Sequence, residues 1–298
     1  MSRAKSFLGR LLGRAVPSAT PEVEPGVSDP VQGLPDPAFF LNALFDRLPP
    51  NLDGLLSRLD DLLAASALPN VTPATLAAWT ELPLGWSATL TAGPYIVVLN
   101  GQQTPLTAAQ QHASIHFSNW SDEQKARLRA HRAHVHLSAW TYLPPDQTLT
   151  LLYAVAAALN PLGVTDETAF NCMPGDLLDE LGTPQGVAAM LEHAPALLWT
   201  GLLKFHRPDD GQVYYTTRGF ERFGKPNLAW LAPVGSGEEA AELFDALLNY
   251  QYHYDQLFAP GHTAEMDGRT MRFSEPTEYA DHLSGGLPVL TVEVRRPN

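Results

Sequence analysis

The sequence of 298 residues is poor in cysteine, in basic side chains and in long apolar runs, and each shortage excludes a class of protein. Cys172 is the only cysteine, so the chain cannot form an internal disulfide framework, and a reducing cytoplasm is the expected compartment. No apolar run approaches the ~18 residues that a membrane-spanning helix requires. The apolar part of residues 1–16 is too short, and too often interrupted by arginine, for a secretory signal.

Acidic residues outnumber basic ones by 32 to 19, which gives a formal net charge of −13. The body of the chain carries this charge, because the basic residues of segment 1–16 are balanced by the acidic residues of segment 17–37. An acidic surface repels phosphate groups, so the composition argues against nucleic-acid binding. It favours solubility or a basic protein partner.

Proline and charge divide the chain into three parts. Residues 1–35 predict a flexible basic tail followed by a Pro-rich acidic linker. Residues 1–16 could form an amphipathic helix, but two glycines weaken it, so we do not expect membrane contact there. Residues 36–83 predict a helical N-terminal extension, and residues 84–298 the main domain. The helices expected in the extension cover residues 36–48, 52–67 and 74–82.

The main domain mixes strand-like and helix-like segments, joined in part by hairpins. Apolar and β-branched runs predict strands, and Gly211 supplies the positive φ that a tight hairpin turn needs. Ser121 and Gln124 have the spacing of a capping box and predict a helix from residue 122 to 131. This mixture predicts an α+β fold with a mixed or largely antiparallel sheet packed by helices.

Three histidines occur within HRAHVHL, residues 131–137. The alternating pattern from Ala133 predicts a half-buried strand whose wet face carries His134 and His136. His131 follows the preceding helix, where the helix dipole favours a protonated imidazole. The alternative is a metal site of a hydrolase, in which His134 and His136 bind the metal and His116 or His262 supplies a third ligand. We predict no metal and no other cofactor, because that third ligand cannot be assigned.

Three further motifs suggest chemistry without completing it. Residues 219–226, GFERFGKP, match a phosphate-binding loop except at Pro226, where a magnesium-binding Ser or Thr is required. Cys172 would need a base to act as a nucleophile, and lone cysteines are commonly buried. Arg218, Glu221 and Tyr254 are candidates for a small-molecule binding pocket.

An ordered series of segments resembles a bacterial family of unknown function. The segments are HRAHVHL, LLWTGLLKFH, DDGQVYYTTRGFERFG and the late helix ending in NYQY. They are similar to domain-of-unknown-function family 4261, over roughly residues 85–295. The correspondence falls on His131, His134, Trp199, Thr217, Gly219 and Gly224. The resemblance implies a common fold and carries no catalytic assignment.

These observations favour a cytoplasmic, non-enzymatic interaction module, associated with immunity or stress, that offers an acidic surface to a basic protein. The sequence contains no complete catalytic set, which is why we place an enzyme second. The metal-assisted hydrolase and the small-molecule binding domain are the two alternatives.

Overall fold

The computed structural model describes residues 39–64, 66, 68–116, 118, 120–140, 144–193, 196–207, 210–266, 268–284 and 287–295. The described chain divides into two compact units, the first containing the residues up to His193 and the second those from Ala196. Each unit combines a sheet with helices, which confirms the predicted α+β fold. Within the described ranges, no helix is both long and apolar enough to cross a bilayer.

The first unit is built on a seven-stranded antiparallel sheet with the strand order β2-β3-β4-β5-β1-β6-β7. Its strands are β1 (Phe40–Phe45), β2 (Thr75–Leu82), β3 (Gly85–Ala92), β4 (Tyr95–Gln102), β5 (Ala133–Trp140), β6 (Gly163–Asp166) and β7 (Asn171–Pro174). Gly93, with a φ of 69°, makes the turn between β3 and β4. In this strand order β1 and β5 lie inside the sheet, and β2 and β7 form its edges.

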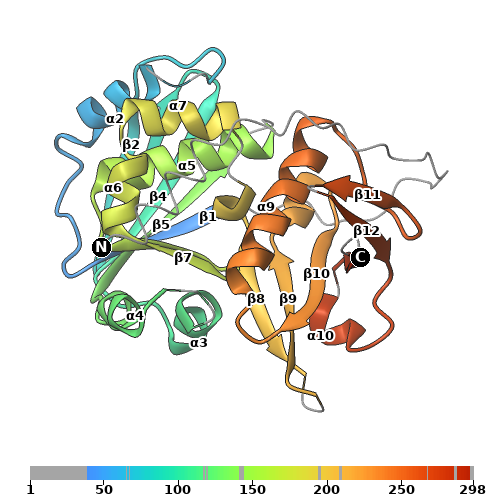
Figure 1. Cartoon of the computed structure of the whole chain (residues 1–298). Coiled ribbons are helices and arrows are strands. Elements are labelled where there is room, and N and C mark those ends of the chain that lie inside the picture. Colours follow the sequence, from blue (N-terminus) through green and yellow to red (C-terminus); the bar gives the residue numbers. More distant parts are fainter. Residues whose placement is uncertain are drawn as a thin grey trace. The chain divides into compact units, whose positions relative to one another are not determined.

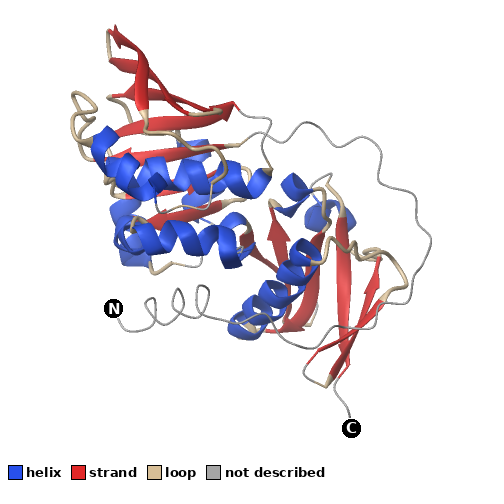
Figure 2. Cartoon of the chain, turned by 90° about the horizontal axis from the view of Figure 1, so that it is seen from above, coloured by secondary structure: helices blue, strands red, loops and turns tan. Residues whose placement is uncertain are grey.

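Helices lie on both sides of this sheet (Figure 1). One side carries α2 (Leu55–Ala64), α5 (Pro145–Leu159), α6 (Gly175–Leu181) and α7 (Pro184–His193). The other side carries α3 (Ala108–Gln111), the π-helix η1 (His112–His116) and α4 (Asp122–Arg129). Alternate residues of each strand face one side, so Val135 and Leu137 are fully buried under the first group of helices. One end of the sheet has no helix over it (Figure 2).

The second unit has a six-stranded mixed sheet with the order β11-β12-β13-β10-β9-β8, in which only the described pair β10 and β13 is parallel. The strands are β8 (Gly201–His206), β9 (Gln212–Arg218), β10 (Asn227–Pro233), β11 (Thr263–Met266), β12 (Arg269–Ser274) and β13 (Val289–Arg295). The helices are α8 (Ala196–Trp199), the 3-10 turn η2 (Phe220–Phe223), α9 (Gly237–His253) and α10 (Ala280–Ser284). Phe244 and Leu248 of α9 pack with Phe273 and Met271 in the main core of this unit.

The predicted helical extension at residues 36–83 is wrong in two of its three helices. Residues 52–67 contain α2, as expected, but residues 40–45 form β1 and residues 75–82 form β2. FLNALF is too short for its apolar residues to distinguish a helix from a strand, and pairing on both sides decides for the strand. TLAAWTEL has alanines that favour a helix, yet it pairs along its length with β3. The predicted start at Asp36 lies outside the described residues, as does the tail of residues 1–35.

The domain division also differs from the expected one. Strands β1 and β2 belong to the same sheet as β3, β4 and β5, so residues 40–83 are part of the first unit and not an extension before residue 84. The predicted main domain, 84–298, is split between the two units. The sequence does not announce this division, because residues near 194 show no proline-rich or glycine-rich linker comparable with residues 16–35.

Candidate functional site

The histidine strand β5 occupies the position predicted for it, but its polar face is not an open wet surface. His134 is 9% exposed and His136 is half-buried. The segment from Thr104 to α3 contributes to this burial, since the carbonyl oxygen of Thr104 lies 2.7 Å from Nδ1 of His134. The prediction of two solvated imidazoles is therefore wrong for His134. Sequence alternation shows that a face is polar, and it cannot show that a distant segment covers that face.

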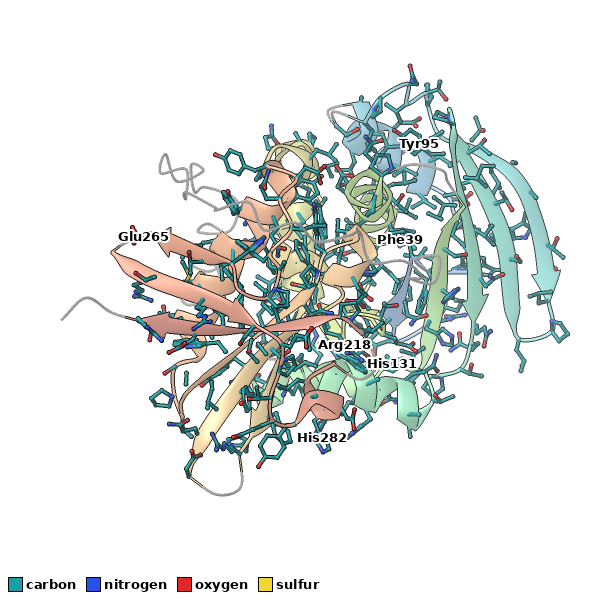
Figure 3. All side chains as sticks on the ribbon, turned by 90° about the vertical axis from the view of Figure 1, so that its right-hand side faces the viewer. Phe39, Tyr95, His131, Arg218, Glu265 and His282 are labelled. Atoms are coloured by element: carbon teal, nitrogen blue, oxygen red, sulfur yellow. The ribbon has the colours of Figure 1, made fainter. Side chains whose placement is uncertain are left out.

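His131 is neutral in the structure, which corrects the expected protonated state. Its Nε2 accepts a hydrogen bond from the backbone N–H of Leu106 at 2.9 Å, so this nitrogen carries no proton. Nδ1 must then carry the proton, which it donates to the carbonyl oxygen of Leu128 at 2.6 Å. Burial lowers the pKa of His131, and the neighbouring His134 acts in the same direction. The residue, labelled in Figure 3, locks the end of α4 to the loop before α3.

A relay of side chains orients His136. Nδ1 of His136 lies 3.0 Å from the side-chain oxygen of Asn42, which can only accept, so Nδ1 carries the proton. The amide nitrogen of Asn42 donates to Oε1 of Glu167 at 2.8 Å, and Gln110 donates to the same oxygen at 3.0 Å. Asn42 is 2% exposed, so this connection from β1 to the turn after β6 is inside the protein. The relay leaves Nε2, the outer nitrogen of His136, without a proton in the neutral ring.

The charges of the relay follow from its burial. Burial lowers the pKa of His136, with a smaller contribution from His134, so the neutral imidazole dominates near pH 7. Burial also raises the pKa of Glu167, although the hydrogen bonds from Asn42 and Gln110 oppose that change. A neutral imidazole of fixed orientation can accept a proton or a hydrogen bond through Nε2. The ring of Phe40 lies beside it, with centroids 5.3 Å apart.

The structure does not assemble the predicted metal ligands. His134 is drawn towards Thr104, which follows β4, while His136 is drawn towards Asn42 on β1, so the two rings engage opposite neighbours. His116 lies exposed on η1, and Nδ1 of His262, in the second unit, accepts from the N–H of Ala259. No group of three or more histidine, cysteine, aspartate or glutamate side chains suited to a metal ion occurs in the described part of the chain.

His112 and His116 do meet, because the segment that carries them is helical. Their rings stack with centroids 4.5 Å apart at an interplanar angle of 19°. Although His116 is exposed, partial desolvation of its ring lowers its pKa, and the neighbouring His112 and nearby cations act in the same direction. Four-residue spacing therefore produces contact here, as expected for a helix.

Cys172 is a buried side chain and not an activated thiol. It lies on β7, 3% exposed, in a small core with Leu44, Ile115 and Leu128. Burial raises the pKa of the Cys172 thiol to about 11. Two strands, β1 and β6, separate it from the histidines of β5, which agrees with its predicted structural role.

Of the residues predicted to form a pocket in the second unit, Glu221 mainly stabilises the turn that follows β9. Oε2 of Glu221 accepts from the N–H of Gly219 at 2.9 Å and from the side chain of Asn227 at 2.7 Å. Arg218 is half-buried; burial lowers its pKa, and Glu221 opposes that shift. Tyr254 is 42% exposed at the end of α9, with its ring 5.0 Å from that of Tyr250. Glu221 stabilises the turn, and Gly219 and Gly224 both have positive φ, which glycine adopts without strain.

A second surface, which the sequence did not reveal, lies at the β2 edge of the first sheet. Seven of the eight β2 residues are exposed. Beside the strand lies an open hollow of about 270 Å³, and the residues that line it include Glu81 and the stacked pair Trp79 and Trp86. The composition of the run TLAAWTEL predicts a helix, so the sequence gives no indication that this segment is an exposed sheet edge.

Comparisons of the chain with protein-family models, with curated proteins and with solved structures find no match. The resemblance to family 4261 therefore stays a prediction. Of its six residues, His131 and His134 bind backbone carbonyl groups, and Thr217 accepts from the N–H of Leu228. The carbonyl oxygen of Trp199 accepts from the buried Arg222. These contacts give the resemblance residues structural roles.

Proposed function

We propose that this protein is an interaction module that binds an extended segment of a basic partner protein as an additional strand along β2. The exposure of β2 carries this proposal. An edge strand presents unpaired backbone N–H and carbonyl groups, which pair with a strand of another chain. Side chains on alternate positions of the added strand would then contact the two faces of the sheet next to β2.

The β2 edge lacks most of the features that commonly prevent such pairing, although its register with β3 shifts between Leu76 and Ala78. Its eight residues contain no lysine, arginine or proline, and Glu81 is the only charge. The opposite edge, β7, has four residues and ends at Pro174. In the second sheet, β11 also has four residues, and the edge strand β8 carries Lys204. Short strands, prolines and charged residues protect these edges, so β2 is the most accessible of the described ones.

Exposed apolar side chains concentrate at the same place. Leu76 and Leu82 of β2 are 41% and 46% exposed, and Leu84 in the turn to β3 is 67% exposed. Single exposed leucines are ordinary, whereas several on and beside one edge strand indicate a contact surface for a protein.

The net charge of −13 suggests that the partner is positively charged. A basic segment is attracted over the Debye length, ~8–10 Å at physiological salt, and association should weaken as salt screens that attraction. The single cysteine is buried, which suits the reducing cytoplasm in which we place this interaction.

The test is affinity capture with the full chain at low and at high salt, followed by comparison of variants. Leu76→Ser removes an exposed apolar side chain from the edge, and Thr80→Pro removes a backbone N–H from the same strand. Leu257→Ser is the matched control, because Leu257 is 44% exposed in the second unit. Circular dichroism and urea unfolding establish that each variant is folded.

Support requires a captured protein that Leu76→Ser or Thr80→Pro loses and Leu257→Ser retains. Its contact segment, mapped by hydrogen exchange, should be extended and basic, and capture should fall as salt rises. Equal capture by all variants would contradict binding along β2. Capture of no protein at either salt concentration would contradict the interaction module itself.

A further inference from the structure

We infer that the hollow beside β2 receives a lysine or arginine side chain of the added strand, and this inference rests on the proposed function. The hollow is about 270 Å³ in volume and open to solvent. That is smaller than the roughly 300–1,000 Å³ of pockets for drug-sized ligands, so it suits one side chain and not a whole cofactor.

Two tryptophans form the wall of the hollow that selects a cation. The rings of Trp79 and Trp86 stack with centroids 4.9 Å apart at 26°. Trp86 is 3% exposed and its indole N–H donates to the carbonyl oxygen of Pro49 at 2.7 Å, which fixes the pair. Trp79 is half-buried, so part of it remains available. Indole rings attract lysine and arginine through the negative face of the π-system.

Glu81 adds a negative charge at the same place. It lies two residues after Trp79 on β2, and directly opposite Trp86 in the register with β3. Glu81 is exposed, and none of the described cations forms a salt bridge with it. A guanidinium or ammonium group in the hollow would therefore contact both an indole face and a carboxylate.

Arg47 also lines the hollow, so charge alone does not decide between a cationic and an anionic guest. The paired indoles decide for the cation, because an aromatic face repels a carboxylate and attracts a guanidinium. Leu48 and Leu82 complete an apolar wall, against which the methylene stem of a lysine or arginine can pack.

The position of the hollow fits strand addition. Trp79 and Glu81 of the edge strand itself line it, so a strand paired with β2 passes beside it. Every second side chain of that strand points to the face that carries the hollow. Backbone pairing would supply affinity, and one basic side chain at this position would supply selectivity.

The experiment uses the full chain labelled with 5-fluorotryptophan, which gives one fluorine signal for each of the six tryptophans. Trp79→Phe and Trp86→Phe assign the two signals of interest. The probes are the Nα-acetyl amides of arginine and lysine, with those of norleucine and glutamate as apolar and acidic controls. We expect arginine and lysine probes to shift the Trp79 and Trp86 signals saturably, at millimolar concentrations, and to leave the other four unchanged.

Two variants test the charge. Glu81→Gln should weaken the arginine probe roughly threefold, the size of effect that exposed charge pairs usually have. Glu265→Gln, an exposed glutamate on β11 labelled in Figure 3, should leave it unchanged. No shift at Trp79 and Trp86, or an equal shift with norleucine, would overturn the inference. A stronger response to the glutamate probe would also overturn it, and would assign the hollow to an acidic side chain bound by Arg47.

The outcomes separate this inference from the proposed function. If Leu76→Ser abolishes capture of the partner and Glu81→Gln does not change it, strand addition stands and the cationic anchor is wrong. If the arginine probe binds as expected but no variant of β2 affects capture, the hollow binds cations and strand addition is wrong.

Discussion

Asn42 and His136 face each other across β1 and β5, and the side-chain oxygen of Asn42 lies 3.0 Å from Nδ1 of His136. This contact joins residues 94 positions apart and fixes which nitrogen of the imidazole carries the proton. Asn42 also donates to Glu167, so one buried amide connects a histidine with a carboxylate.

The first prediction concerns Asn42. Asn42→Ala removes partners from both His136 and Glu167, and each polar group left unpaired in the interior costs about 1–3 kcal/mol. We therefore expect a loss of at least about 2 kcal/mol in the free energy of unfolding, measured in urea. Asn100→Ala is the control, since the side chain of Asn100 is half-buried and accepts from Ser87. Equal losses in the two variants would contradict a special role of Asn42.

The second prediction concerns pH. The pKa of His131 in the folded protein lies below the ordinary value of 6.5, so the folded state binds its proton less readily than the unfolded state. Its contribution to stability is complete above pH 6.5 and is lost as pH falls through the folded pKa. The lowered pKa of His136 acts in the same direction. The pKa of Glu167 is raised, so its contribution to stability has the opposite pH dependence: it is lost as pH rises from 4.5 through the pKa of the folded state.

Comparison with a variant isolates His131. We expect His131→Gln to reduce the decline in unfolding free energy between pH 8 and pH 5, although the variant is less stable at pH 8. His282→Gln, at an exposed histidine, should keep the wild-type decline. A decline of the same size in His131→Gln would mean that other groups cause it.

The third prediction concerns the reactivity of Cys172. A thiol that is 3% exposed and has a pKa of about 11 contains little thiolate at pH 8. Ellman's reagent should therefore leave the native protein unmodified over an hour and titrate one thiol in denaturant. Ala78→Cys provides the control, because residue 78 is exposed on β2 and should react within minutes. Rapid reaction of native wild-type protein would show that β7 opens readily.

The fourth prediction concerns two glycines: one has a backbone conformation that favours glycine, and the other has no space for a side chain. Gly224 has a φ of 68°, and a Cβ there would meet nothing within 4 Å, so Gly224→Ala should cost about 1–2 kcal/mol from backbone strain alone. Gly224→Asn should cost less, because asparagine tolerates this conformation. Gly85 faces the carbonyl oxygen of Gly101 across β3 and β4, and Gly85→Ala should cost more than Gly224→Ala. Urea unfolding of the three variants ranks them, and the reverse order would refute this account.

Local patterns predicted the elements whose reasons are local. Ser121 and Gln124 form the predicted capping box, and α4 begins at Asp122. The alternation of His134 and His136 with Val135 and Leu137 predicted β5 and its two faces. Such patterns depend on neighbours within a few residues, so the sequence contains the necessary information.

Other elements depend on partners that are distant in sequence. β1 is a strand because β5 and β6 pair with it, and Asn42 meets Glu167 across 125 residues. In FLNALF the asparagine is the only polar residue, which indicates that its side chain has a specific hydrogen-bond partner in the interior. The hollow at Trp79 and Glu81 could not be predicted at all, because it requires β2 to be an edge strand.

Six polar side chains of the first sheet stand in one line across six of its strands. Thr80, Ser87, Asn100, His136, Asn42 and Thr165 are opposite one another in successive pairs from β2 to β6. A slip of one position in any of these strands would turn its polar residue to the opposite face of the sheet and break the line. A slip of two positions would keep the apolar residues on their own face but would still separate a polar residue from its neighbours in the line, so the line distinguishes the native register from one that the apolar pattern alone would tolerate.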